Sequence, residues 1–447
     1  MIKLGDKFHK KMTCFLVTAC ISISPCNSLF ADLAVVVDAY GPGRYYVEYF
    51  AKKGVKTIHL QSSKKPLNGF TLANVDKYEA LVIHDEDIAA TAAQLILAAE
   101  NLGEKIICVI AGAEPGVLLA DELSEKLNLQ TNGTKRSLAR RDKFAMAEAA
   151  QAHGIQTPQM YKTALLEEAL VFARSLGVWP VVLKPLNSAG TNGVHICYSE
   201  DEMRQAFLDV LGTTNNLGLV NEEILVQSYL AGREYMVNSV SLNGQHYITD
   251  IWIYDKSVKP GYATIYDRNV LLESESPVSQ ILAEFTKNVL DSLEIKFGPG
   301  HTEVIITEAG PALVECAARA SGGCEPTLMF TCLHHNQMDL TVDAYIEPAV
   351  FLERTKKPYI VFKKGIQVFF VSKREGKIKA LNLEDNLRKL PSFLNAIIRI
   401  KVGSDLKKTI DLATTAGFCH LVGDDFNVLD QDYRQIEKIF NDSIVLE

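Results

Sequence analysis

The feature that most restricts the fold is an alternation of short apolar runs and helical stretches near the start of the chain. Leu33–Val37 has the composition of a buried strand, and Gly41-Pro-Gly43 follows it as a turn. Further strands are predicted over Val55–Leu60, Ala80–His84 and Lys105–Ala111, and helices over Arg44–Lys53 and Thr91–Asn101. Strands and helices alternate in this way when a parallel sheet carries helices on both faces. The sequence therefore predicts an α/β domain that ends near Thr131.

A second and a third region follow this domain. The second is predicted to open with a helix over Lys135–His153 and to continue with three groups of strands: Val181–Lys184 with Val194–Tyr198, Ile224–Tyr229 with Glu234–Leu242, and His301–Thr307 with Ala312–Cys316. The segment Asp255–Glu275 has little periodicity and is predicted to be a long functional loop, with Tyr262, Tyr266, Asp267 and Arg268 at a substrate pocket. After Pro348, strands are predicted over Gly365–Arg374 and Ile397–Val402, and a helix over Asp432–Phe440. The predicted fold class is α/β, with α+β character in the central part, and the predicted boundaries are 1–31, 32–133, 134–347 and 348–447.

Composition excludes several classes of function. The 447 residues have a formal net charge of −8 and no long Lys/Arg run, so neither nucleic acid nor a membrane is expected as a partner. Nine cysteines form no Cys-x-x-Cys pair, which argues against a zinc ribbon and a disulfide framework. The P-loop, nucleophile-elbow, zinc-protease and kinase motifs are missing from the sequence. Any phosphate site must therefore use another architecture.

The first 31 residues have a composition of their own. Four lysines precede the apolar run Cys14–Ile23, and a small residue, Ala31, ends the segment, as in a secretory signal. The apolar run is too short and too interrupted by Thr and Ser to span a bilayer as a helix. The other interpretation is a non-essential extension, translated from a start codon upstream of the real one.

A hairpin that carries a lysine is predicted around residues 180–197. One strand ends at Lys184, and a loop rich in glycine, serine and asparagine follows over Leu186–Gly193. Such a loop can present backbone N–H groups and the Ser188 hydroxyl to phosphate oxygens, while Lys184 supplies a fixed charge. Lys143, on the preceding helix, could reach the same phosphates. Each lysine taken alone is better explained as a solvated surface residue.

Two glutamates stand in apolar strands where a hairpin would set them side by side. Glu315 follows Glu303 by 12 residues. Carboxylates at close range repel unless a cation joins them, and hard oxygen ligands with spare positions for phosphate oxygens suit Mg²⁺. The structural alternative is a buried salt bridge to Arg319.

A second pair of strands could bind a nucleoside. Gln227, Ser228 and Leu230 could meet the edge of a purine, and Glu234 could accept hydrogen bonds from both ribose hydroxyls. The alternative is a surface hairpin with a charged turn.

Together these residues resemble the ATP-grasp superfamily of carboxylate–amine ligases, from about Leu33 onward. The strings His301-Thr-Glu303 and Glu315-Cys-Ala-Ala-Arg319, with the strand-rich tail after Pro348, are most similar to the bacterial L-amino-acid ligases, which make dipeptides. The resemblance implies an ATP-grasp fold with an N-terminal parallel-sheet domain, an ATP-binding core of two subdomains and a strand-rich C-terminal domain. It also implies ATP and two Mg²⁺ ions, with Mn²⁺ as a substitute.

The resemblance also implies residue roles. Lys143 and Lys184 would hold the α- and β-phosphates under a flap from Ser188 to Gly193. Gln227, Ser228 and Leu230 would read adenine, Glu234 the ribose, and Glu303 and Glu315 would bind the metal. Arg319, with the N–H groups of Gly322 and Gly323, would stabilise the acyl-phosphate and the tetrahedral intermediate. Many ATP-grasp ligases carry Asn two residues after the second acid, where this chain has Ala317. The third metal ligand is then absent or supplied by water.

The implied activity is the joining of a carboxylate, that of an L-amino acid, to the amine of a second amino acid, with release of ADP and phosphate. The alternatives are an ATP-grasp enzyme of carboxylase or nucleotide-biosynthesis type and a non-catalytic ATP-binding module. Small-molecule substrates and a homodimer are expected. A cytoplasmic location is also expected, because export would separate the enzyme from its ATP. Cys316, Cys324 and Cys332 are interpreted as small buried hydrophobes rather than nucleophiles.

Overall fold

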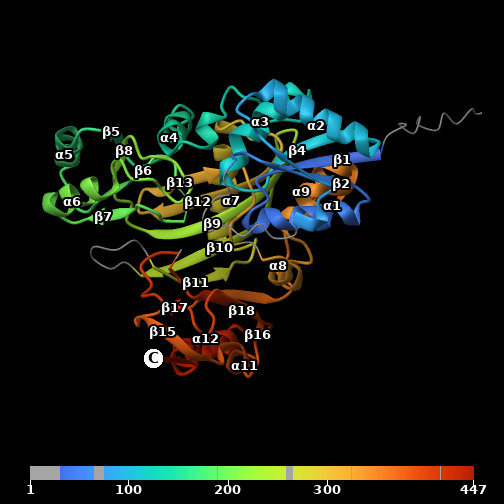
Figure 1. Cartoon of the computed structure of the whole chain (residues 1–447). Coiled ribbons are helices and arrows are strands. Elements are labelled where there is room, and N and C mark those ends of the chain that lie inside the picture. Colours follow the sequence, from blue (N-terminus) through green and yellow to red (C-terminus); the bar gives the residue numbers. More distant parts are fainter. Residues whose placement is uncertain (1–30, 65–74, 189, 258–264, 324, 413) are drawn as a thin grey trace, which may run out of the picture.

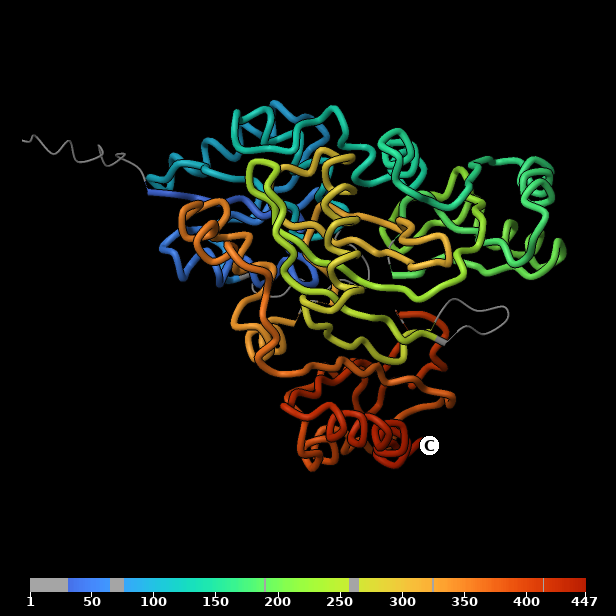
Figure 2. Tube along the Cα trace, turned by 180° about the vertical axis from the view of Figure 1, so that it is seen from behind, coloured from blue at the N-terminus to red at the C-terminus, as the bar shows by residue number. Residues whose placement is uncertain are grey.

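The computed structural model describes residues 31–447 except 65–74, 189, 258–264, 324 and 413. A large sheet, whose strands differ in length, occupies the centre of the molecule (Figures 1 and 2). In both views the parallel sheet of the N-terminal part lies toward one end of this large sheet and a small antiparallel sheet toward the other, with the C-terminal part beneath. No helix among these described residues is long and apolar enough to cross a membrane. The signal-like segment lies almost wholly outside the described residues.

The N-terminal part is a parallel sheet, as the sequence predicts. Its strand order is β3-β2-β1-β4, and every pairing is parallel. Leu33, Val35 and Val37 pack with one core that includes helix residues such as Leu95 and Leu123, whereas Ala34 and Val36 pack with Tyr46 and Phe50 on the other face. Both faces of the sheet are therefore covered. The elements are β1 Ala31–Val37, α1 Tyr46–Lys52, β2 Lys56–Gln61, β3 Ala80–Ile83, α2 Ile88–Leu102, β4 Glu104–Ala111 and α3 Val117–Lys126.

A short helix and a small antiparallel sheet come next in the chain. The helix predicted over residues 135–153 is shorter in the structure: α4 spans Lys143–Gln151 and follows a 3-10 turn at Leu138–Arg140. The prediction missed this boundary because Asp142 caps the helix, accepting hydrogen bonds from the backbone N–H groups of Phe144 and Ala145. The sheet has the order β5-β8-β6-β7. Its elements are β5 Met160–Thr163, α5 Leu166–Ser175, β6 Val181–Pro185, β7 His195–Cys197, α6 Glu200–Val210 and β8 Ile224–Ser228.

The central sheet has eight strands in the order β13-β12-β9-β10-β11-β14-β18-β16, and each neighbouring pair is antiparallel. Helices α7 and α9 pack against β9 and β12. The strands are β9 Arg233–Leu242, β10 Gln245–Ser257, β11 Ile265–Leu271, β12 Gly298–Thr307, β13 Gly310–Ala317, β14 Lys364–Phe369, β16 Phe393–Ile398 and β18 Gly417–Gly423. The helices are α7 Pro277–Ser292, α8 Pro326–Leu333, α9 Gln337–Ile346 and α10 Pro348–Arg354.

The prediction of a long loop over residues 255–275 is wrong where the structure describes strands, at residues 255–257 and 265–271. β10 runs to Ser257 and β11 begins at Ile265, and the two strands pair in a hairpin with Tyr254 opposite Asn269. The sequence pattern of β11 did not predict a strand because polar residues interrupt its apolar positions. Their side chains bond distant partners instead: Arg268 bonds Asp430, and Asn269 bonds Gln367. Tyr262, which the same prediction placed in this loop, lies outside the described residues.

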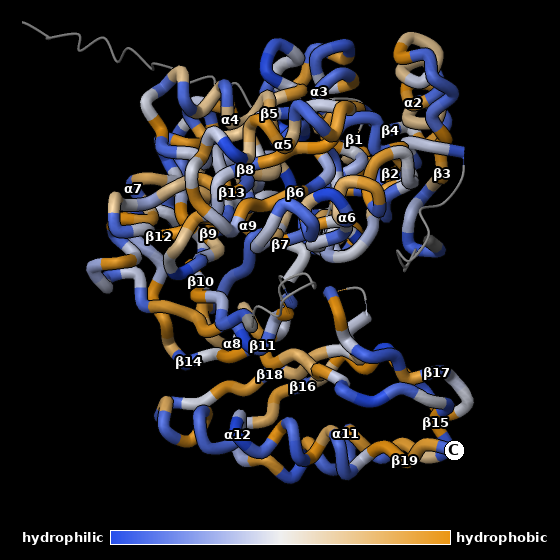
Figure 3. Tube along the Cα trace, turned by 90° about the vertical axis from the view of Figure 1, so that its left-hand side faces the viewer, coloured by the Kyte–Doolittle hydropathy of each residue, from blue (hydrophilic) through white to orange (hydrophobic). Residues whose placement is uncertain are grey.

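The C-terminal part continues the central sheet. β11 pairs with β14, so the sheet runs without a break across the boundary predicted between residues 347 and 348, and the division into domains stays a prediction. The strand predicted over 397–402 lies a few residues earlier, as β16. A small sheet adds β15 Gly376–Leu381, β17 Asp405–Leu406 and β19 Ile444–Leu446, with α11 Leu383–Leu387 and α12 Phe426–Asp442. Along α12, apolar and polar residues alternate with the helical period, and Leu429, Ile436 and Phe440 face the core (Figure 3).

Candidate active site

The hairpin of β12 and β13 sets two glutamates opposite each other. Glu303 and Glu315 are direct partners in the register, as the spacing predicts. Both side chains are about one-fifth exposed, so they can reach a bound ion. Burial opposes the ionised form of Glu303, but His301, whose Nε2 lies 3.7 Å from Glu303 Oε1, and the charges of Lys256 and Arg319 lower the pKa of Glu303 to about 2. Glu303 is therefore a carboxylate at any working pH, as a metal ligand must be.

The two predicted lysines lie beside this acidic pair. Lys143 Nζ is 3.3 Å from Glu315 Oε2 and donates a hydrogen bond of 3.0 Å to the carbonyl oxygen of Ser188. Lys184 ends up buried in β6, and burial together with the charge of Lys143 lowers its pKa to about 8, against the pull of nearby glutamates. Two buried ammonium groups at one place would be stabilised by an anionic ligand such as a phosphate.

Arg319 is held by a carboxylate that the sequence did not single out. Its Nε donates to Glu114 Oε2 at 2.7 Å, and Arg141 lies 3.5 Å from the other oxygen of Glu114. Glu114 follows β4 of the parallel sheet, 205 residues before Arg319. The alternative of a salt bridge between Arg319 and the Glu303–Glu315 pair is wrong, because the ion pair of Arg319 is made with Glu114. Arg319 is thereby positioned between the N-terminal part and the acidic pair.

The residues predicted to read the nucleoside lie on β8, β9 and the link between them. Gln227 is buried, and its Oε1 has no hydrogen-bond partner. The backbone N–H of Ser228 already donates to the carbonyl oxygen of Gln159, and the Ser228 hydroxyl accepts from the N–H of Gln159. Leu230 lies half-buried in the link. The unpartnered oxygen of Gln227 is the acceptor left for a ligand such as an amino group.

Glu234 and a lysine that the sequence analysis missed form an ion pair. Lys256 Nζ lies 2.6 Å from Glu234 Oε1 and 4.3 Å from the ring centroids of Tyr254 and Tyr266. The Tyr254 hydroxyl donates to Glu303 Oε1 at 3.4 Å, which links this pair to the acidic pair. Because Lys256 lies in the segment predicted to be a loop, its position at the end of a paired strand had no local signal.

The segment after β13 carries the remaining predicted residues. Gly322 and Gly323 are exposed, and the N–H of Gly323 donates weakly to the Ser321 hydroxyl at 3.3 Å. Ala317 is buried opposite His301, so its position supplies no metal ligand. Burial raises the pKa of the Cys316 and Cys332 thiols to about 12, which fits their interpretation as hydrophobes; Cys324 lies outside the described residues.

The residues fit a nucleotide with its metal better than a metal held by protein alone. In the part of the chain that the structure describes, no group of three or more His, Cys, Asp or Glu side chains could hold an ion. Two carboxylates with two lysines instead leave coordination positions for phosphate oxygens.

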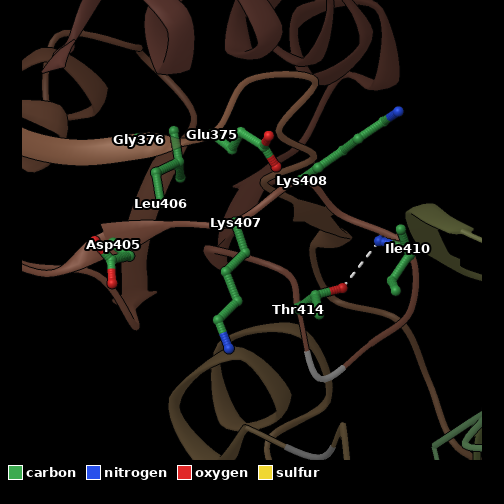
Figure 4. A pocket seen from close by; sticks show the side chains of 8 residues that line it. All are labelled: Glu375, Gly376, Asp405, Leu406, Lys407, Lys408, Ile410 and Thr414. Carbon is green, nitrogen blue, oxygen red and sulfur yellow. Dashed lines mark hydrogen bonds between the residues drawn. The ribbon is translucent and has the colours of Figure 1, made fainter.

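One surface hollow lies outside the site. Its volume is about 560 Å³, and it is lined by residues of β15, β17 and the 407–414 segment, where the Ile410 N–H donates to the Thr414 hydroxyl (Figure 4). It contains none of the residues described above.

Known proteins share the domain that carries most of these residues. Residues 178–327 match the family model of the ATP-grasp domain. Dapdiamide A synthase of Enterobacter agglomerans is 29% identical over 416 residues, which are 91% of this chain and 96% of the relative. The L-arginine-specific L-amino acid ligase of Bacillus subtilis is 24% identical over 219 residues, 48% of this chain and 52% of that protein.

Solved structures show the same fold. The crystal structure of an L-amino acid ligase from Bacillus licheniformis superposes with a TM-score of 0.73 at 16% identity, over 93% of this chain and 99% of that one. N5-carboxyaminoimidazole ribonucleotide synthetase from Thermotoga maritima superposes with a TM-score of 0.63 at 15% identity, over 94% and 100%. The matched domain lies in a chain that aligns with a relative along nearly the whole length of that relative. Two lysines, two glutamates and an arginine converge in the same chain. The chain therefore contains an ATP-grasp domain, and it is similar along nearly its whole length to a dapdiamide synthase.

Proposed function

We propose that this ATP-dependent ligase joins the carboxylate of one L-amino acid to the amine of a second amino acid through an acyl-phosphate, releasing ADP and phosphate. The observation that carries the proposal is the convergence of Lys143, Lys184, Glu303, Glu315 and Arg319 at one end of the β12–β13 hairpin. Two of the relatives described above are named as a dapdiamide synthase and an L-amino acid ligase, which supports amino acids as substrates.

The first step must overcome repulsion between anions. A carboxylate that attacks the γ-phosphate of ATP approaches a group of the same sign, so the site needs fixed positive charge along the line of attack. Lys143 and Lys184 would bind the phosphates, and Glu303 and Glu315 would hold two magnesium ions. The ions supply charge neutralisation between the phosphates when bound. Ser188 to Gly193 would cover the phosphates and exclude water from the acyl-phosphate.

The second step builds negative charge on an oxygen. When the amine attacks the acyl carbon, the carbonyl oxygen becomes an oxyanion, and phosphate then leaves to give the amide. Arg319 would stabilise this charge, with the N–H groups of Gly322 and Gly323 as further donors. Glu114 acts on Arg319 by fixing the orientation of its guanidinium.

A phosphate-release screen tests the function. Purified protein with ATP, Mg²⁺ and pairs of amino acids should release phosphate, and mass spectrometry should find the dipeptide in the same reactions. The absence of phosphate above background with every pair would overturn the proposal. A carboxylase or nucleotide-biosynthesis activity would release phosphate with other acids but form no dipeptide.

One substitution separates an enzyme from a non-catalytic ATP-binding module. Arg319→Ala should keep ATP affinity and lose phosphate release, because the guanidinium acts on the acyl group. Arg388→Ala is the matched control, since Arg388 is exposed at the C-terminal end of α11 and pairs with Glu384. A module would show no functional difference between the two variants.

We further propose that the enzyme works in the cytoplasm, where its ATP is made, and that it forms a homodimer. Immunoblotting of cell fractions with sequencing of the mature amino terminus tests the location; a form cleaved after Ala31 and found outside the cytoplasm would contradict it. Sedimentation of the purified protein tests the dimer.

A further inference from the structure

Lys256 is a cation of the site to which the proposed mechanism gives no role. It lies near the end of β10 with its ammonium between two aromatic rings and one carboxylate, and its side chain is 11% exposed. The Tyr266 hydroxyl is also hydrogen-bonded to it. A lysine that is desolvated, ion-paired and placed over two rings is held in one position, which an exposed lysine is not.

The partner of Lys256 lies in an unfavourable place for a carboxylate. Burial and the charge of Glu303 both raise the pKa of Glu234, while Lys256 and Lys184 act against this rise. A protonated Glu234 would be a weaker acceptor for ribose hydroxyls, because hydrogen bonds to an ionised carboxylate are stronger than hydrogen bonds to the neutral acid. Lys256 bonds Oε1 of Glu234, so Oε2 is the oxygen that remains for a ligand.

We propose that Lys256 is a positioning residue for the nucleotide: it keeps Glu234 ionised and oriented toward the ribose hydroxyls, and Tyr254 and Tyr266 fix its ammonium for that task. The inference rests on the proposed function in one respect, because it takes the ligand of Glu234 to be the ribose of ATP. Lys256 acts through Glu234 and contacts neither the transferred phosphoryl group nor the amino acids.

A binding experiment with two nucleotides tests this role in the full chain. Equilibrium binding of Mg-ATP and of Mg-2′,3′-dideoxy-ATP is measured without amino acids, so no turnover is needed. The wild-type protein should bind ATP about ten- to a hundredfold more tightly than the dideoxy analogue, the range expected for hydrogen bonds to a charged group. K256M should lose most of this preference, and E234Q and the double variant should lose no more than K256M. K256R should keep most of it.

The control is Lys373→Met, because Lys373 is exposed and pairs with Glu437 on α12. It should bind both nucleotides as the wild type does. If K256M does not fold by circular dichroism, Y266F provides the readout, since it keeps the ring and removes the hydroxyl that bonds Lys256. Y266F should then show a smaller loss of the same preference.

The pH dependence gives a second readout. The groups that face Glu234 are Lys256, Tyr254, Tyr266, Tyr229, Glu303 and Lys184. Without Lys256, the pKa of Glu234 rises further, so the ATP affinity of K256M should increase with pH as Glu234 ionises. The affinity of the wild type should depend less on pH in the same range.

Two results would overturn the inference. One is a K256M variant that prefers ATP over the dideoxy analogue as strongly as the wild type. The other is a K256M variant with unchanged ATP affinity and a lowered kcat, which would place Lys256 at the phosphoryl group instead. A wild-type protein that shows the coupling but forms no dipeptide would refute the ligase function and leave this role standing.

Discussion

Glu114 gives the sharpest test of how the site is assembled. It comes from the N-terminal part, yet it accepts a 2.7 Å hydrogen bond from Nε of Arg319 and faces Arg141 at 3.5 Å. Glu114→Gln keeps the size of the side chain and removes its charge, and Glu114→Ala removes the acceptor altogether. Both variants keep Arg319 in the site, but its guanidinium is less firmly fixed in orientation.

The expected sizes follow from the buried ion pair. Glu114→Gln replaces a hydrogen bond between two charged groups by one between Arg319 and a neutral amide, a loss of about 1–1.5 kcal/mol, so kcat should fall about tenfold. Glu114→Ala leaves a buried arginine without its partner, which costs about 3–5 kcal/mol of unfolding free energy. Its kcat should fall about a hundredfold or more, the loss expected when an oxyanion donor is misplaced.

The stability change has a defined dependence on pH. Burial opposes the ionisation of Glu114, but the charges of Arg319, Arg141 and Lys143 outweigh it and lower its pKa. A lowered pKa contributes stability above the ordinary pKa of a glutamate, and this stability is lost as the pH falls through the folded-state value. The difference in unfolding free energy between the wild type and Glu114→Gln should therefore be largest at neutral pH and shrink in acid.

Phosphate release, ATP binding and denaturant unfolding are measured together on each variant. Glu104→Gln is the matched control, because Glu104 is a buried carboxylate at the other end of β4 and pairs with Lys56 at 2.8 Å. The control should keep full kcat. If Glu114→Gln and Glu114→Ala both retained kcat within about threefold of the control, Glu114 would not position Arg319 and the assignment would be wrong.

Three further predictions concern the other groups of the site. Because burial lowers the pKa of Lys184 to about 8, kcat/KM for ATP should fall as the pH rises above that value, and Lys184→Arg should abolish the fall; a wild-type profile flat to pH 9.5 would contradict this. Glu315→Gln should raise the magnesium concentration for half-maximal phosphate release by about tenfold or more. The control is Glu308→Gln, on the turn of the same hairpin. If both variants needed the same magnesium concentration, Glu315 would be excluded as a ligand. The Cys316 thiol, whose pKa burial raises to about 12, should resist iodoacetamide in the native protein by peptide mass mapping, and its rapid alkylation would reopen a nucleophilic role.

Local patterns in the sequence were enough for much of the fold. The apolar run around Val35, buried on both faces, predicted a parallel sheet because only a strand covered from both sides tolerates such a run. The 12-residue spacing of Glu303 and Glu315 predicted their pairing because a hairpin is a short-range structure whose register follows from the length between its strands. Both inferences depend on residues that are neighbours in sequence.

Other elements needed the tertiary structure. β11 resembles a loop in sequence, since Arg268 and Asn269 interrupt its apolar pattern, but both side chains find partners on segments about 100 or more residues away. Likewise the helix boundary at Lys143 depended on a capping bond that polarity alone did not reveal.

By itself the sequence determined the chemistry that the chain can perform: it supplied the lysines, the paired glutamates and the arginine, together with the strands that carry them. The tertiary structure decided which groups hold these in place. Glu114 meets Arg319 across 205 residues, and Lys256 meets Glu234 in the neighbouring strand. These contacts depend on how separate sheets pack and on where strand ends fall in the register, and the free energy of that packing is spread over the whole core rather than encoded in any one segment.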